Sequence, residues 1–141
     1  VLISVLEHVK NPNNFLRSFV KSNLKYLYIV LPLFSLSVFT EHVFNNVYPR
    51  LLGGAHTHIY SKESIEYMTR RFNLNIIGEW WFGNEFVDLY RSFSVKSNSL
   101  AKKNSFNKKF NQILKNNIDN FQKILDKQKL SSQVHMVISK K

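Results

Sequence analysis

Short apolar runs that alternate with helix-like segments are the feature that most constrains how this chain can fold. The runs predict buried strands. They lie at Val1–Val5, Leu24–Leu31 and Leu74–Trp81. The segments between them carry apolar residues at helical spacing and begin with helix-capping residues, as at Asn11-Pro12 and Ser61. Strands that alternate with helices are typical of an α/β sheet, so we predict this fold class.

The last part of the chain adds two predicted helices and a closing strand. The first helix follows Gly83, and the second is a long amphipathic helix over Phe106–Leu125. Apolar and polar residues alternate over Gln133–Ser139, which favours an antiparallel strand at the sheet edge. We expect residues 1–95 to form the core, residues 96–130 a basic linker and amphipathic helix, and residues 131–141 the closing strand of the same domain.

Two segments lack a regular pattern and are predicted to be irregular. Phe34–Ala55 contains Pro49 and two glycines, and loops of this length are usually functional. Ser94–Ser105 is rich in lysine, serine and asparagine, as surface linkers are. The chain begins at Val1 with strand-like residues, so we also expect it to be part of a longer protein.

Composition excludes several classes of protein. Of 141 residues, 44% are apolar and 14% aromatic, which argues against intrinsic disorder. There is no cysteine, which excludes disulfides, cysteine-bound zinc and thiol catalysis, and the four glycines cannot form a G-x-G-x-x-G motif. The most apolar stretch, Tyr26–Phe39, is shorter than the roughly 20 residues of a membrane span, so we predict no transmembrane segment.

The positive charge has two explanations. The formal net charge is +11, and Lys96–Lys129 alone holds nine lysines against two aspartates. Such a surface would suit a polyanion. The abundance of Asn, Lys, Phe, Ile and Ser is equally what AT-rich codons encode. Because no basic segment carries regularly spaced aromatic residues, we expect no nucleic-acid partner.

Several motifs resemble a known family. V-L-E-H-V at residues 5–9, followed by Asn11-Pro12, resembles the motif that follows the fourth strand in class I S-adenosylmethionine-dependent methyltransferases. The loop H-T-H-I-Y-S at residues 56–61 resembles the loop before that family's next helix. G-E-W-W-F-G at residues 78–83 and D-L-Y-R-S at residues 88–92 resemble a subgroup found beside bacterial polysaccharide and cell-surface genes.

The resemblance implies a fold and an activity. The chain would be the C-terminal half of a Rossmann-like sheet with an antiparallel last strand. The parent enzyme would transfer a methyl group from S-adenosylmethionine to an oxygen or nitrogen of a small or sugar-like acceptor, in the cytoplasm. The family's glycine-rich cofactor loop is absent from the sequence, so we expect this chain by itself to be inactive. The oligomeric state is left open.

The resemblance also assigns candidate cofactor-binding residues. These lie at and just after the carboxyl end of the first predicted strand, where ligands of open α/β sheets bind, although core packing is an alternative role for them. They are Ser4, Val5, Leu6, Glu7 and His8. Similar acidic-histidine motifs hold a divalent cation in ubiquinone-biosynthesis and small-RNA methyltransferases. Here Ser4 replaces the first glutamate, and two ligands are few for Mg²⁺, so we predict no metal site and a structural Glu7–His8 pair.

Two histidines are the candidate catalytic residues. His56 and His58 lie two positions apart in the predicted loop. A neutral imidazole can accept the proton of a hydroxyl or amine that attacks a methyl sulfonium. The alternative is that either histidine is exposed, or structural. Among the remaining candidates, we expect one of the adjacent Trp80 and Trp81 to be in the core, and Asp88 and Arg91 to form an ion pair on a helix surface.

Two functions of other classes stay open. The chain would be a non-catalytic, degenerate methyltransferase module for binding or scaffolding if the parent protein lacks the glycine-rich loop. It would be a polyanion-binding module if Lys96–Lys129 binds anionic partners with steep salt dependence.

Overall fold

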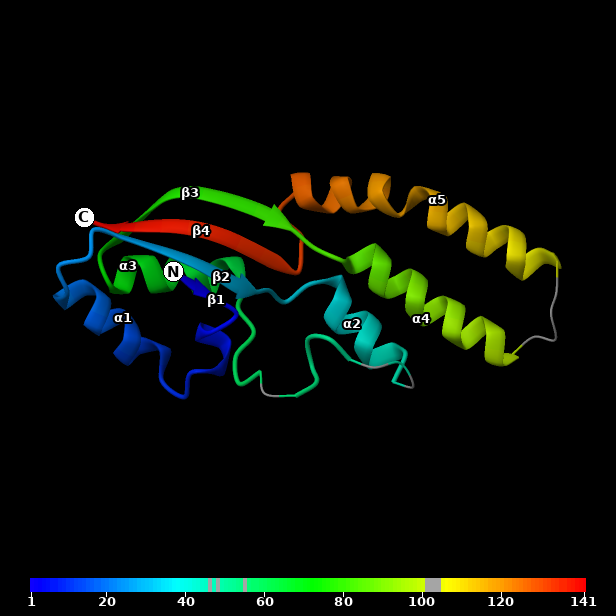
Figure 1. Ribbon diagram of the computed structural model, residues 1–141, viewed down its shortest axis with the longest axis horizontal. Coiled ribbons are helices and arrows are strands. Elements are labelled where there is room, and N and C mark those ends of the chain that lie inside the picture. The colour runs from blue at the N-terminus through cyan, green and yellow to red at the C-terminus, as the bar shows by residue number, and fades with distance from the viewer. Residues whose placement is uncertain (46, 48, 55, 101–104) are drawn as a thin grey trace. The chain divides into compact units, whose positions relative to one another are not determined.

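A computed structural model describes residues 1–45, 47, 49–54, 56–100 and 105–141 and has a mixed α/β fold (Figure 1). The chain divides into two compact units, each assembled from separate stretches of sequence. The sheet unit comprises Val1–Phe34, Gly54–Trp81 and Gln133–Lys141. The helical unit comprises Ser35–Gly53 and Phe82–Ser132.

A four-stranded mixed sheet forms the centre of the sheet unit. The strands are β1 (Leu2–Ile3), β2 (Tyr26–Pro32), β3 (Leu74–Phe82) and β4 (Gln133–Lys140), in the spatial order β1-β2-β4-β3. β1 is parallel to β2, whereas β4 is antiparallel to β2. The predicted antiparallel direction of the last strand is therefore confirmed. Its predicted place at the edge is wrong, because β4 lies between β2 and β3; its alternating pattern reflects two faces of different burial.

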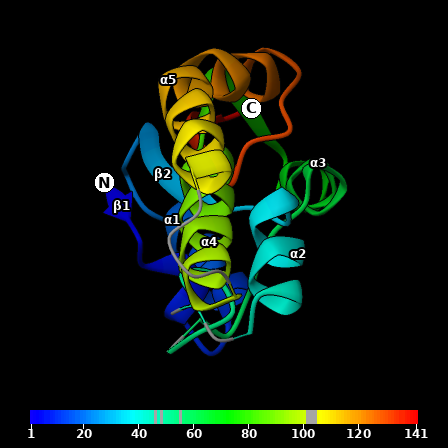
Figure 2. The same cartoon turned by 90° about the vertical axis from the view of Figure 1, so that its right-hand side faces the viewer.

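One face of this sheet carries the core. Leu27, Ile29 and Leu31 of β2 are paired with Ile138, Met136 and Val134 of β4, and all six side chains are buried. The helices α1 (Pro12–Lys21) and α3 (Lys62–Arg71) pack their apolar residues into the same cluster. Both helices lie on the same side of the sheet (Figures 1 and 2).

Both helices begin directly after the predicted N-terminal capping residues. Asn11 Oδ1 accepts a hydrogen bond from the backbone N–H of Asn14 at 3.2 Å, and Pro12 occupies the first helical position. Ser61 and Ser64 cap α3 reciprocally, each accepting from the other's backbone N–H. The predicted helices of the sheet unit are therefore confirmed.

The first strand is shorter and more exposed than predicted. The run Val1–Val5 forms only the two-residue strand β1, and the Ile3 side chain is 58% exposed. Ser4 then adopts a left-handed conformation with φ of 51°, which ends the extended backbone and leads into a 3₁₀ turn over Leu6–His8.

The helical unit corrects both segments predicted to be irregular. Phe34–Ala55 contains α2 (Leu36–Val43), because Ser35 Oγ accepts from the Ser37 N–H and caps a helix. In Ser94–Ser105, α4 (Glu85–Leu100) continues to Leu100 and α5 (Ser105–Lys127) begins at Ser105. The intervening residues 101–104 lie outside the described residues.

Aromatic pairs join α4 to α5. Phe86 stacks on Phe121 with ring centroids 5.0 Å apart, and Phe93 meets Phe110 edge to face at 5.2 Å. The pairing fixes α4 and α5 side by side (Figure 2). Within the described residues, no helix combines the length and the apolar character that crossing a membrane requires.

Candidate functional site

The backbone carbonyl of Glu7 brings together the two predicted groups of site residues. It accepts hydrogen bonds from the N–H groups of Thr57 at 2.9 Å and His58 at 3.2 Å. The Thr57 hydroxyl donates to the same oxygen at 2.8 Å. These bonds fix the loop that carries His56 and His58 against the turn that follows β1. Residues far apart in the sequence therefore share one site within the sheet unit.

The same loop is also fixed to the end of β2. The Tyr60 N–H donates to the Pro32 carbonyl at 3.0 Å, and the Phe34 N–H donates to the Tyr60 carbonyl at 2.7 Å. The Tyr60 hydroxyl donates to the Leu6 carbonyl at 3.4 Å. The loop therefore crosses the carboxyl ends of two parallel neighbouring strands, which is where open α/β sheets bind their ligands. Burial raises the pKa of Tyr60 to about 12, and the negative charge of Glu7 adds to the effect.

The five predicted cofactor-binding residues differ in what they offer a ligand. Ser4, Val5 and His8 are exposed. Leu6 is fully buried in the core cluster, and Glu7 is 2% exposed. Ser4 combines exposure with a left-handed backbone, a conformation that costs energy for a residue with a Cβ and is concentrated at functional sites. Cofactor contact by this segment stays a prediction.

Glu7, His8 and His56 form a compact cluster of possible metal ligands. One ligand atom of each residue lies within 4.8 Å of the others. Glu7 Oε1 is 3.9 Å from His8 Nε2, and the rings of His8 and His56 have centroids 4.9 Å apart. The predicted Glu7–His8 pair is thus joined by a histidine from a distant part of the sequence.

The hydrogen bonds of Thr57 determine the tautomer of His58. Thr57 Oγ1 lies 2.8 Å from His58 Nδ1 as well as 2.8 Å from the Glu7 carbonyl oxygen. Because a carbonyl oxygen only accepts, the single hydroxyl hydrogen points to Glu7. The contact to His58 then requires that Nδ1 carry a hydrogen and donate to Thr57. In the neutral ring, Nε2 therefore keeps its lone pair.

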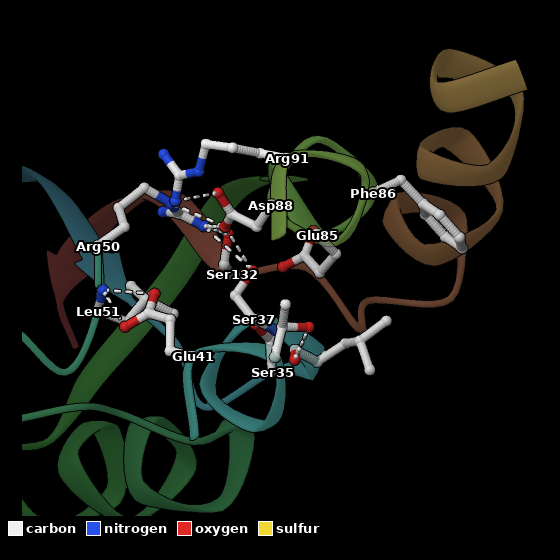
Figure 3. Close-up of polar contacts among 12 residues, drawn as sticks. Ser35, Ser37, Glu41, Arg50, Leu51, Glu85, Phe86, Asp88, Arg91 and Ser132 are labelled. Carbon is white, nitrogen blue, oxygen red and sulfur yellow. Dashed lines mark hydrogen bonds and ion pairs between the residues drawn. The ribbon is translucent and has the colours of Figure 1, made fainter. Parts of the chain in front are cut away.

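The helical unit holds a buried ionic network that sequence analysis missed (Figure 3). Asp88 is 2% exposed, so the predicted surface position of its ion pair is wrong. Its closest cationic partner is Arg50, whose Nη2 and Nε donate to Asp88 Oδ2 at 2.7 and 3.0 Å; Arg91 lies farther away, at 3.5 Å. Ser37 donates to the same oxygen at 2.8 Å, and Arg50 Nη2 also donates to Ser132 Oγ at 3.0 Å.

Two further buried carboxylates fix loops and helix ends in the helical unit. Glu41 accepts from the backbone N–H groups of Leu51 and Leu52, each at 2.7 Å. Glu85 begins α4 and accepts from Gln122 Nε2 at 2.6 Å. A Cβ at Gly83 would lie 2.1 Å from Glu85 Oε2, so a larger residue there would displace the Glu85 carboxylate. No apolar pattern in the sequence marks these carboxylates as buried, because the face of α4 that carries Glu85 and Asp88 continues with polar Ser92, which is buried as well.

The adjacent tryptophans lie on opposite faces of β3, as predicted. Trp81 is 9% exposed and belongs to the core, whereas Trp80 is 64% exposed. The Trp80 ring lies 5.3 Å from the ring of His135, which also contacts the Tyr28 hydroxyl. Burial lowers the pKa of His135. Trp80 therefore offers an aromatic surface on the face of the sheet opposite the core.

Comparison with known proteins adds no family assignment. No protein-family model matches the chain, and no curated protein matches it significantly. The methyltransferase resemblance of the sequence therefore stays a prediction. The geometry of residues 4–8 and 56–60 supplies the physical basis for a functional proposal.

Proposed function

We propose that the chain is the C-terminal part of a class I methyltransferase domain that transfers a methyl group from S-adenosylmethionine to an oxygen or nitrogen of a small or sugar-like acceptor. The observation that carries the proposal is the set of hydrogen bonds from Thr57 and His58 to the Glu7 carbonyl. They bring the predicted catalytic histidines to the segment predicted to bind the cofactor.

The sheet supports the same proposal. β1 and β2 are parallel neighbours, and the candidate site lies at their carboxyl ends. The last strand is antiparallel to β2, as the family resemblance implies. The motif-bearing segments thus lie where a ligand-binding sheet of this type would need them. Such an arrangement is common to many activities, so the choice of methyl transfer rests on the motifs.

In this proposal, His58 is the general base. The acceptor's lone pair forms a bond to the methyl carbon while the carbon–sulfur bond breaks, and its electrons stay on the sulfur of S-adenosylhomocysteine. The acceptor's proton passes to His58 Nε2, the nitrogen that the Thr57 contact leaves unprotonated. Ser4, Val5 and His8 are the exposed groups that would contact the cofactor, and the domain's main contribution is to orient the two reactants.

The test uses the full-length gene product that contains this sequence, because the family's glycine-rich loop does not occur within these 141 residues. Methyl transfer from labelled S-adenosylmethionine is measured with a panel of nucleotide-activated sugars. His58→Ala is expected to slow transfer by about 10²- to 10⁴-fold. Its affinity for S-adenosylhomocysteine should stay within about threefold of wild type, a difference of under 1 kcal/mol. The matched control is His42→Ala, which removes an exposed histidine from α2.

Two results would contradict the proposal. Unchanged transfer in His58→Ala would remove the assigned base. Failure of the full-length protein to bind S-adenosylhomocysteine would remove the whole activity and favour a non-catalytic module.

A further inference from the structure

Three metal-ligating side chains converge beside the end of β1. A carboxylate oxygen of Glu7 and one imidazole nitrogen each of His8 and His56 lie within 4.8 Å of one another. We propose that these residues form a binding site for a single zinc-class divalent cation. The proposal does not depend on methyl transfer, because cation binding needs neither S-adenosylmethionine nor an acceptor.

The state of the Glu7 carboxylate is an independent observation that points to a cation. The side chain is 2% exposed, and its Oε2 atom has no hydrogen-bond partner within the described part of the chain. A buried carboxylate without full pairing is costly, because it loses its hydration and gains little in return. A cation bound to this carboxylate would supply the missing charge and a ligand for the oxygen.

The fold holds the third ligand in position before any cation binds. His56 is followed directly by Thr57, whose N–H and hydroxyl both donate to the Glu7 carbonyl. These two hydrogen bonds connect the backbone of Glu7, one ligand residue, to Thr57, the residue next to the ligand His56. Little conformational entropy then remains to be lost when the site closes, which favours binding.

The ligand set selects the kind of cation. Two imidazoles and a carboxylate suit Zn²⁺, whereas Mg²⁺ prefers oxygen ligands and water. With bonds of about 2.0–2.1 Å, ligand atoms of a tetrahedral site lie about 3.3 Å apart, so separations in the cluster must shorten by up to about 1.5 Å. His8 is exposed and can move inward by rotating its side chain. Three protein ligands leave the fourth position for water or another ligand.

The sequence prediction of no metal considered only the adjacent Glu7 and His8. Two neighbouring ligands are too few to bind a cation firmly. The folded chain adds His56 from the loop across the carboxyl ends of the strands, and this third ligand changes the conclusion.

The test is a titration of the 141-residue chain with zinc chloride, in which isothermal titration calorimetry measures the affinity and the number of sites. We expect one saturable site. His56→Ala should weaken binding at least about tenfold, the scale on which even outer-shell partners affect metal affinity. Glu7→Gln should do the same, and circular dichroism checks that each variant folds. The matched control, His58→Ala, alters the same loop without removing a proposed ligand and should stay within about threefold of wild type.

A second readout, the midpoint of thermal unfolding, compares the variants at one zinc concentration. Zinc should raise this midpoint in wild type and in His58→Ala, because it binds only the folded site, and should raise it less in His56→Ala and Glu7→Gln, which bind zinc more weakly. The proposal is overturned if wild type shows no saturable zinc site, or if His56→Ala binds zinc as tightly as wild type does.

Discussion

Replacement of the Arg50 guanidinium by an uncharged group should destabilise the helical unit by about 3 kcal/mol. Arg50→Met leaves the Asp88 carboxylate buried, with the loss of two charge-assisted hydrogen bonds at 2.7 and 3.0 Å. Breaking a buried ion pair by removing one partner typically costs about 3–5 kcal/mol. The lower value applies, because the Arg50 side chain is 25% exposed and Arg91 still lies 3.5 Å from Asp88.

A double-mutant cycle separates this pair from other effects of the substitution. Asp88→Asn alone should cost about 2 kcal/mol, because Arg50 then loses its charged acceptor. The double variant should be more stable than the sum of the single losses predicts, by at least about 1.5 kcal/mol, because contacting residues are not additive. Lys123→Met is the control, since it removes a positive charge from an exposed position of α5.

The assay is urea unfolding followed with two probes. Far-ultraviolet circular dichroism reports chiefly on the helices, whereas tryptophan fluorescence reports on the sheet unit, which contains Trp80 and Trp81. Comparison of the two transitions shows whether the units unfold together. A loss below about 1 kcal/mol in Arg50→Met, or additive losses in the cycle, would refute the structural role given to this pair.

Two further predictions concern the loop at the candidate site. Tyr60 has a raised pKa of about 12, so its neutral form is favoured in the folded state, and stability should fall as pH rises from about 10 toward 12. Between pH 9 and pH 11 this group should contribute a loss of about 1 kcal/mol, which Tyr60→Phe should abolish in urea unfolding; an equal loss in the variant would count against it. Thr57→Val removes the acceptor of His58 Nδ1. Long-range ¹H–¹⁵N spectra at pH 8 should show the Nδ1–H tautomer in wild type and a mixture in the variant; an Nε2–H tautomer in wild type would exclude the proposed proton acceptor.

Elements with local signals were predictable from the sequence. The Asn11 and Ser61 caps, together with apolar residues at helical spacing, gave α1 and α3. The alternation over Gln133–Ser139 gave the last strand, although alternation shows that the two faces differ in burial and does not by itself place a strand at an edge.

Helical segments with polar composition were harder to predict. The last turns of α4 contain serines that resemble a linker, yet Ser97 and Ser99 donate to the carbonyls of Ser94 and Lys96 within the same helix. Their hydroxyls are thus satisfied without interrupting the helix. Ser35 capped α2 without a long apolar pattern to mark it.

Contacts between distant residues lay beyond a reading of local pattern. The spacing predicted Arg91, one helical turn away, as the partner of Asp88, but the fold brings Arg50 from a loop to a shorter distance. Likewise, nothing local places His56 beside Glu7. Motif resemblance pointed to both segments of the candidate site, and only the three-dimensional structure joins them through the Glu7 carbonyl.

The most direct test of the central proposal locates S-adenosylhomocysteine on the protein. The full-length gene product is titrated with this ligand while amide signals are followed by NMR. We predict chemical-shift changes at Ser4, Val5 and His8. We predict none at Asn23 and Lys25, which precede β2 and so lie at the end of that strand opposite the proposed site. Binding that leaves the first three signals unchanged, or no binding at all, would contradict the proposed site.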